Sequence, residues 1–146
     1  LERAEFARYG RMHRNTYIHA PRCLYPTLQW RQREDVWFAG QLAGTEGYAG
    51  AVATGWLVGV NAARALQGRS QVVPPAETMI GALCRALSGG PEKGFQPIKA
   101  NFGILPLPQG AVPPGREQRA AVLVHRARQA LSAWLSGIRS DNSAPL

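Results

Sequence analysis

The sequence is poor in thiol and imidazole side chains. Its 146 residues contain two cysteines, Cys23 and Cys84, and three histidines, His13, His19 and His125, and none of them forms a CxxC or similarly spaced cluster. A zinc site needs about four ligands at recognisable spacing. We therefore expect no metal site, and two scattered cysteines give no reason to place the chain in an oxidising compartment.

Long apolar runs and lysines are also scarce. No apolar stretch approaches the ~20 residues of a membrane span, so we expect a cytoplasmic protein without membrane contact. The net charge of +8 comes from arginine, because Lys93 and Lys99 are the two lysines. A basic surface favours polyanions such as nucleic acid, but a biased genomic base composition would produce the same arginine excess. The charge alone leaves nucleic-acid binding open.

Two further features are missing at the level of the whole chain. The sequence opens at Leu1 without an initiator methionine, and it contains no GxGxxG dinucleotide fingerprint. The simplest interpretation is that the chain is a piece of a longer polypeptide. The missing N-terminal part of that polypeptide would then be a partner of this piece.

Glycine, in contrast, is concentrated in the stretch FAGQLAGTEGYAGAVATGWLVGVNAAR. The pattern predicts a buried strand over Val36–Ala39, a loop with Gly40, Gly44 and Gly47, and a helix from Tyr48 to about Leu66. A glycine loop that opens a helix can bind an anionic group at the helix N-terminus. Close packing of another helix would explain the same glycines, so spacing alone does not decide between the two.

Two more helices are predicted from apolar residues at helical spacing and from the prolines and glycines that flank them. The sequence VVPPAETMIGALCRALSGG predicts a helix with Pro74 and Pro75 before or at its first turn, with Glu77 at its positive end and with Cys84 on its apolar stripe as a small buried hydrophobe. Residues 91–115 predict an extended segment, ordered by docking of its apolar side chains. REQRAAVLVHRARQALSAWLSG predicts the last helix, followed by a frayed tail, SDNSAPL.

The glycine-rich stretch resembles the second flavin-contacting motif of the GidA-related flavoproteins. Two tRNA-modifying families share that motif: the FAD- and folate-dependent tRNA (uracil-5-)-methyltransferases and the GidA-type carboxymethylaminomethyl-uridine enzymes. RYGRMHRNTYIHAP upstream, and VVPPAETMIGAL and FQPIKANFGILPLP downstream, favour the first family. The resemblance covers about residues 5–135.

The resemblance implies an α/β fold, the C-terminal part of a Rossmann-like FAD-binding domain with short strands, a glycine-rich loop and three helices. Residues 1–34 would be a basic segment that leads back into the FAD domain. Residues 35–90 would hold the strand, glycine loop and helix that contact the flavin. Residues 91–146 would be the extended Pro/Gly-rich segment and the C-terminal helix.

The resemblance also implies site residues. Cofactor contacts would come from Gly40, Gln41, Gly44, Glu46, Gly47 and Tyr48, and folate or tRNA contacts from Arg11, His13 and Arg14. Tyr48 would stack on the isoalloxazine ring; the alternative for Tyr48 is a core aromatic that caps the helix.

The activity that the resemblance implies is methylation of C5 of a uracil in the tRNA T-loop. Methylenetetrahydrofolate would donate the one-carbon unit, and NAD(P)H would replenish reduced FAD. The family's reactive cysteines lie upstream of this piece, so we expect no catalytic residue here and no activity from the piece alone. The alternatives are a GidA-type wobble-uridine enzyme, which NFGILPLP argues against, and a flavin-less RNA-binding remnant.

We predict that Arg14→Ala in the intact enzyme lowers affinity for tRNA or folate, because the planar donor fork of arginine suits both phosphates and carboxylates. Binding of each ligand to the variant checks this. Unchanged affinity for both would make Arg14 a structural partner of Glu5 or Asp35 instead.

Overall fold

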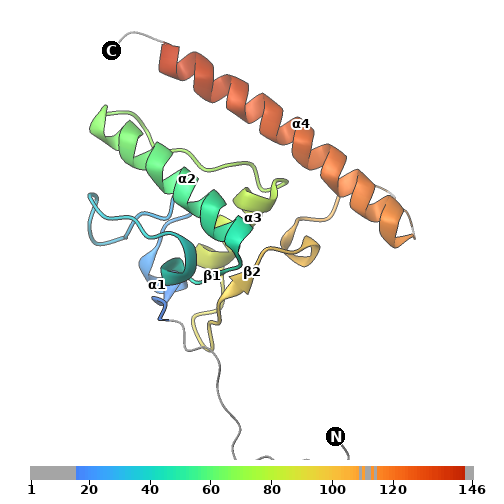
Figure 1. Cartoon of the computed structure of the whole chain (residues 1–146), viewed down its shortest axis with the longest axis horizontal. Coiled ribbons are helices and arrows are strands. Elements are labelled where there is room, and N and C mark those ends of the chain that lie inside the picture. The colour runs from blue at the N-terminus through green and yellow to red at the C-terminus, as the bar shows by residue number, and fades with distance from the viewer. Residues whose placement is uncertain (1–15, 109, 111–112, 114, 144–146) are drawn as a thin grey trace, which may run out of the picture.

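The computed structural model describes residues 16–108, 110, 113 and 115–143. It is a mixed α/β arrangement in which the long helix α4 crosses one side of the molecule, above α2 and α3, and a two-stranded parallel sheet lies on the other side (Figure 1). The elements in chain order are α1 (Ala20–Cys23), η1 (Gly40–Ala43), β1 (Thr45–Glu46), α2 (Tyr48–Leu66), α3 (Met79–Gly89), β2 (Ile98–Lys99), η2 (Phe102–Ile104) and α4 (Arg116–Ser143). No helix in the described part is long and apolar enough to cross a membrane.

The predicted first long helix is confirmed as α2, with the expected bounds. Its buried face packs on α3 and η1 and carries Leu57 in the centre of the core. Leu57 lies in a cluster with leucines and Phe95 from the segments around it, whose buried members are Ala20, Leu24, Leu28, Ala43, Leu83, Cys84 and Leu87. The core therefore forms where α1, η1 and α3 meet the inner face of α2.

The strand predicted over Val36–Ala39 is wrong. Trp37 forms an isolated antiparallel bridge with Gln29, and the segment is only half buried. Its partner segment begins at Leu28, which has a left-handed φ of 65°. A residue in that conformation cannot continue an extended strand, so pairing stops after one bridge.

The predicted second helix is confirmed as α3, but its first turn differs from the prediction. Thr78 is the N-cap, and its hydroxyl accepts a hydrogen bond from the Gly81 backbone N–H at 3.0 Å. Glu77 precedes this cap, so it lies outside the first turn. Pro74 and Pro75 lie before the helix, where their missing N–H groups cost no helical bond.

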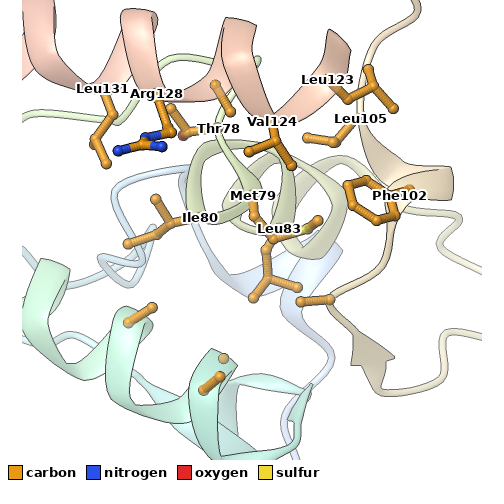
Figure 2. Close-up of a pocket in the computed structure, with 15 residues that line it drawn as sticks. Thr78, Met79, Ile80, Leu83, Phe102, Leu105, Leu123, Val124, Arg128 and Leu131 are labelled. Carbon is orange, nitrogen blue, oxygen red and sulfur yellow. The ribbon is translucent and has the colours of Figure 1, made fainter. Parts of the chain in front are cut away.

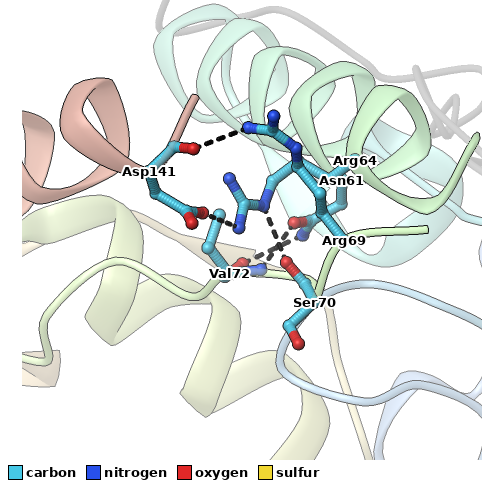
Figure 3. Close-up of polar contacts among 6 residues, drawn as sticks. All are labelled: Asn61, Arg64, Arg69, Ser70, Val72 and Asp141. Atoms are coloured by element: carbon cyan, nitrogen blue, oxygen red, sulfur yellow. Dashed lines mark hydrogen bonds and ion pairs between the residues drawn. The ribbon is translucent and has the colours of Figure 1, made fainter. Parts of the chain in front are cut away.

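The last helix, α4, extends further than predicted. The tail expected to fray is helical through Ser143, and its Asp141 carboxylate accepts a hydrogen bond from the guanidinium of Arg64 at 2.5 Å (Figure 3). Arg64 is 5% exposed and also donates to the Ser70 carbonyl at 2.7 Å. The hydrogen bond from Arg64 lowers the pKa of Asp141. This long-range ion pair stabilises helical structure that local sequence does not favour.

Two further contacts hold α4 against the rest of the molecule. Leu123 is buried with Ala82 and Leu105, and Trp134 meets Trp56 of α2 edge to face with ring centroids 6.2 Å apart. Together with the Arg64–Asp141 pair, these contacts lie near the start, the middle and the end of α4. The helix is thus attached along its length, with space left between the contacts.

We predict that Gly81→Ala destabilises the protein although alanine is the better helix former. A Cβ atom at Gly81 would lie 2.0 Å from the Pro75 carbonyl oxygen and 2.5 Å from that of Pro74. The clash should exceed the helix-propensity gain of about 1 kcal/mol and cost a net ~1–3 kcal/mol. Urea unfolding measures this, with Gly89→Ala as the control because a Cβ there meets nothing within 4 Å. Equal stabilities of the two variants would contradict the prediction.

Candidate functional site

A polar cavity of about 560 Å³ opens at the N-terminal end of α2. Residues from η1, β1, α2 and β2 line it: Gln41, Thr45, Glu46, Gly47, Tyr48, Ala51 and Lys99. Four of the six residues predicted to contact the cofactor therefore lie together around one cavity, namely Gln41, Glu46, Gly47 and Tyr48. The structure brings them together because η1, β1 and the start of α2 follow one another in a tight turn.

The glycines of this loop serve two different purposes. Gly47 has a φ of +87°, and a Cβ placed on it would meet nothing within 4 Å, so the backbone there is open to an outside group. Gly44 has a φ of +86°, but its Cβ would lie 2.8 Å from the Phe95 ring. Gly44 is buried. Neither Gly44 nor Gly40 lines the cavity. The close approach at Gly44 is thus made by the protein core.

The N-terminus of α2 has no side-chain cap. Gly47 is its N-cap residue and has no side chain to accept a hydrogen bond, and no acidic residue occupies the first turn. The first backbone N–H groups of a helix have no partner within the helix, and the helix dipole adds a partial positive charge there. α3 and η2, in contrast, are capped by Thr78 and Asn101. The uncapped start of α2 is suited to an anionic group at the cavity.

Three residues of the cavity, Thr45, Ala51 and Lys99, were not predicted as site residues from the sequence. Lys99 lies beside Glu46 because β1 and β2 pair in parallel, with Thr45 opposite Ile98 and Glu46 opposite Lys99. Thr45 is 2% exposed, and its hydroxyl oxygen has no hydrogen-bond partner among the described residues. Only the pairing of β1 with the distant β2 reveals Lys99, because two-residue strands leave almost no signal in a single sequence. Thr45, in contrast, lies within the glycine loop itself, between Gly44 and Glu46.

Tyr48 is the most exposed large side chain of the cavity. Its exposed fraction is 94%, so the alternative that Tyr48 is a core aromatic does not hold. The phenol ring stands at the first position of α2, next to the open backbone of Gly47. An aromatic ring exposed beside the cavity can stack on a planar group that enters it.

A second cavity, of about 500 Å³, lies between α4 and the other helices (Figure 2). Its walls are almost entirely apolar, with Met79, Ile80 and Leu83 of α3 facing Leu123, Val124 and Leu131 of α4, and Arg128 reaching toward it. Phe102, predicted to be buried by docking, is 49% exposed and lines this cavity. The cavity occupies the space that is left between the contacts of α4 with the rest of the molecule. Its walls offer few polar groups for a dinucleotide.

Neither cysteine has the environment of a nucleophile. Burial raises the pKa of Cys84 to about 12, so its thiol stays protonated at neutral pH, as a structural cysteine should. Cys23 is half buried and packs against the core. In the part of the chain that the structure describes, no three His, Cys, Asp or Glu side chains gather in a metal-binding group. Arg11, His13 and Arg14 lie outside the described residues.

Comparison with known proteins relates the chain to tRNA-modifying enzymes. The family model "Glucose inhibited division protein A" matches residues 1–70. A protein of Thermus thermophilus named methylenetetrahydrofolate–tRNA-(uracil-5-)-methyltransferase TrmFO is 48% identical over 145 residues, which are 99% of this chain and 32% of the relative. Proteins of the same name are 50% identical over 133 residues in a Synechococcus species (91% of this chain, 30% of the relative) and 53% identical over 106 residues in Syntrophomonas wolfei (73% and 24%).

The similarity is continuous and covers nearly every residue of this chain, whereas the chain spans only about a third of the length of the Thermus relative. The stretches that suggested the family in the sequence all lie within the matched 145 residues. Over nearly its whole length the chain is therefore similar to one part of the TrmFO-type proteins, and residues 1–70 are also similar to the GidA family model.

Proposed function

We propose that this chain is part of an enzyme that methylates C5 of a uracil in the tRNA T-loop, with methylenetetrahydrofolate as the one-carbon donor and FAD as the cofactor. The observation that carries the proposal is the 48% identity to the Thermus methyltransferase over 99% of the chain. The relatives that match at this level carry the methyltransferase name, which favours it over a GidA-type wobble-uridine enzyme.

The polar cavity fits one part of a flavin nucleotide. An uncapped helix N-terminus and Lys99 suit negative charge, the open backbone at Gly47 admits close approach, and Tyr48 offers an aromatic face. When bound, the reduced flavin supplies electrons for the reduction of the transferred one-carbon unit, and NAD(P)H would replenish them. The residues of this chain would bind and orient the flavin and stabilise negative charge on it.

The remaining requirements of the reaction would be met elsewhere in the complete polypeptide. Attack on an unactivated uracil C5 requires a nucleophile at C6, for which a thiolate is suited, and neither Cys23 nor Cys84 is placed for that role. A Rossmann-like dinucleotide fold would hold the other end of FAD. Arg11, His13 and Arg14 would contact folate or tRNA, and the chain alone would be inactive.

An activity assay on the complete polypeptide tests the proposed function. We expect transfer of a labelled one-carbon unit from methylenetetrahydrofolate to a T-loop uracil of tRNA, dependent on FAD and on a nicotinamide reductant. A tRNA with cytosine at the target position is the control and should accept no label. Modification at the wobble uridine, or tRNA binding without any methylation, would instead support one of the alternatives.

The flavin contact is tested by Tyr48→Ala in the same polypeptide. Loss of the stacked ring should cost about 1 kcal/mol of binding, hence a roughly fivefold weaker retention of FAD. The flavin absorbance of the purified protein and its FAD titration after stripping measure this. Tyr25→Ala is the matched control, because Tyr25 is also exposed but contacts Arg31 away from the cavity. Equal flavin retention in both variants would remove Tyr48 from the site.

A further inference from the structure

The apolar cavity between α4 and the other helices (Figure 2) is large enough for a small molecule. Its volume of about 500 Å³ lies within the range of about 300–1,000 Å³ that ligand pockets have. Ala49, Gly50 and Ala53 of α2 form its small-residue wall, and α3, η2 and α4 provide larger apolar side chains. An ordered water needs roughly two to four polar partners, and the only polar side chains of the lining are Thr78 and Arg128. The cavity therefore favours an occupant with an apolar body.

The two polar side chains of the lining differ in the hydrogen bonds that they have left for a ligand. The Thr78 hydroxyl accepts from the Gly81 N–H at 3.0 Å and donates to the Pro75 carbonyl at 2.7 Å, so the α3 cap already uses it. Arg128 forms no hydrogen bond or ion pair with any residue that the structure describes. Its guanidinium therefore keeps its N–H donors for solvent or for a ligand.

The charges around Arg128 favour an anionic ligand. Between Glu117 and Asp141, α4 contains four arginines and no acidic residue. The lining of the cavity contains no aspartate or glutamate either. An anionic group beside Arg128 thus meets no carboxylate of the lining, whereas a cation would meet like charge. The planar donor fork of arginine matches a carboxylate, which accepts two parallel hydrogen bonds from it.

Arg128 lies toward one end of an elongated space. The α4 residues of the lining run from Leu123 to Leu131, which is about 12 Å along the helix axis. Figure 2 shows the Arg128 guanidinium beside Leu131, whereas Phe102 and Leu105 lie at the opposite end. A ligand with one charged group at one end of an unbranched apolar tail matches this arrangement.

We propose that the apolar cavity binds a monomeric carboxylate with an unbranched apolar tail, a ligand of the fatty-acid class. The tail lies between α3 and α4, and the carboxylate accepts hydrogen bonds from the guanidinium of Arg128. Binding there is independent of the flavin contacts, because the apolar cavity and the polar cavity at Tyr48 share no lining residue.

Calorimetric titration of dodecanoate, below its micelle concentration, into the complete polypeptide tests the proposal. We expect saturable binding, which Arg128→Ala should weaken roughly tenfold through loss of a charge-assisted pair. Arg119→Ala is the matched control, because Arg119 is also an exposed arginine of α4 but does not line the cavity. Dodecanol has the same tail without the charge and should bind Arg128→Ala and the unaltered protein equally. Absence of dodecanoate binding, or equal dodecanoate affinity with and without Arg128, would overturn the proposal.

A second variant blocks the space of the tail. Ala127→Phe places a ring in the cavity, so dodecanoate affinity should fall by roughly tenfold or more while the melting temperature stays equal or rises. Ala121→Phe is its control, because Ala121 is exposed on α4 outside the cavity. Undiminished binding to Ala127→Phe, or binding to phosphatidylglycerol vesicles without binding of dodecanoate, would overturn the proposal. The titrations need no tRNA or folate, so their failure and a failure of methylation are separate results.

Discussion

The start of α2 is fixed by contacts that leave no room for side chains at two glycines. The Phe95 ring occupies the space of a Cβ at Gly44, and the Thr45 methyl group lies 2.7 Å from a Cβ placed on Gly50. Between them, the Gly44 carbonyl accepts a hydrogen bond from the Ile98 N–H at 2.8 Å, which joins β1 to β2. These contacts place Lys99, Glu46 and the uncapped end of α2 around one cavity, so the geometry of the site depends on core packing.

The same turn separates the roles of residues that look alike in the sequence. Gly44 and Gly47 both have left-handed backbones, but Gly44 faces the core and Gly47 faces open space. The Thr45 side chain is buried and that of Tyr48 is exposed. The loop therefore packs Gly44 and Thr45 into the core and leaves the backbone of Gly47 and the ring of Tyr48 exposed beside the cavity. This division is what makes an adjacent ligand site compatible with a well-packed core.

The outer side of α2 and the space beneath α4 are less closely packed than the core. α2 is held from inside by buried polar contacts, with the Asn61 amide bonded to both backbone groups of Val72 and Arg64 bonded to Ser70 and Asp141 (Figure 3). On its outer side Tyr48, Val52 and Leu66 are exposed, and α4 leaves an apolar cavity above α3 (Figure 2).

The sequence by itself determined the resemblance to the TrmFO-type proteins, the bounds of α2, the existence of α3 and α4, and four residues of the polar cavity, because helix periodicity, the positions of glycine and the loop motif are local signals. Only the tertiary structure decided that Val36–Ala39 is no strand, that α4 extends to an ion pair at Asp141, that Thr45 and Lys99 join the cavity, and that Gly44 serves the core. The ion pair, the position of Lys99 and the packing of Gly44 against Phe95 depend on contacts between segments far apart in the chain, and a local sequence pattern does not reveal such contacts.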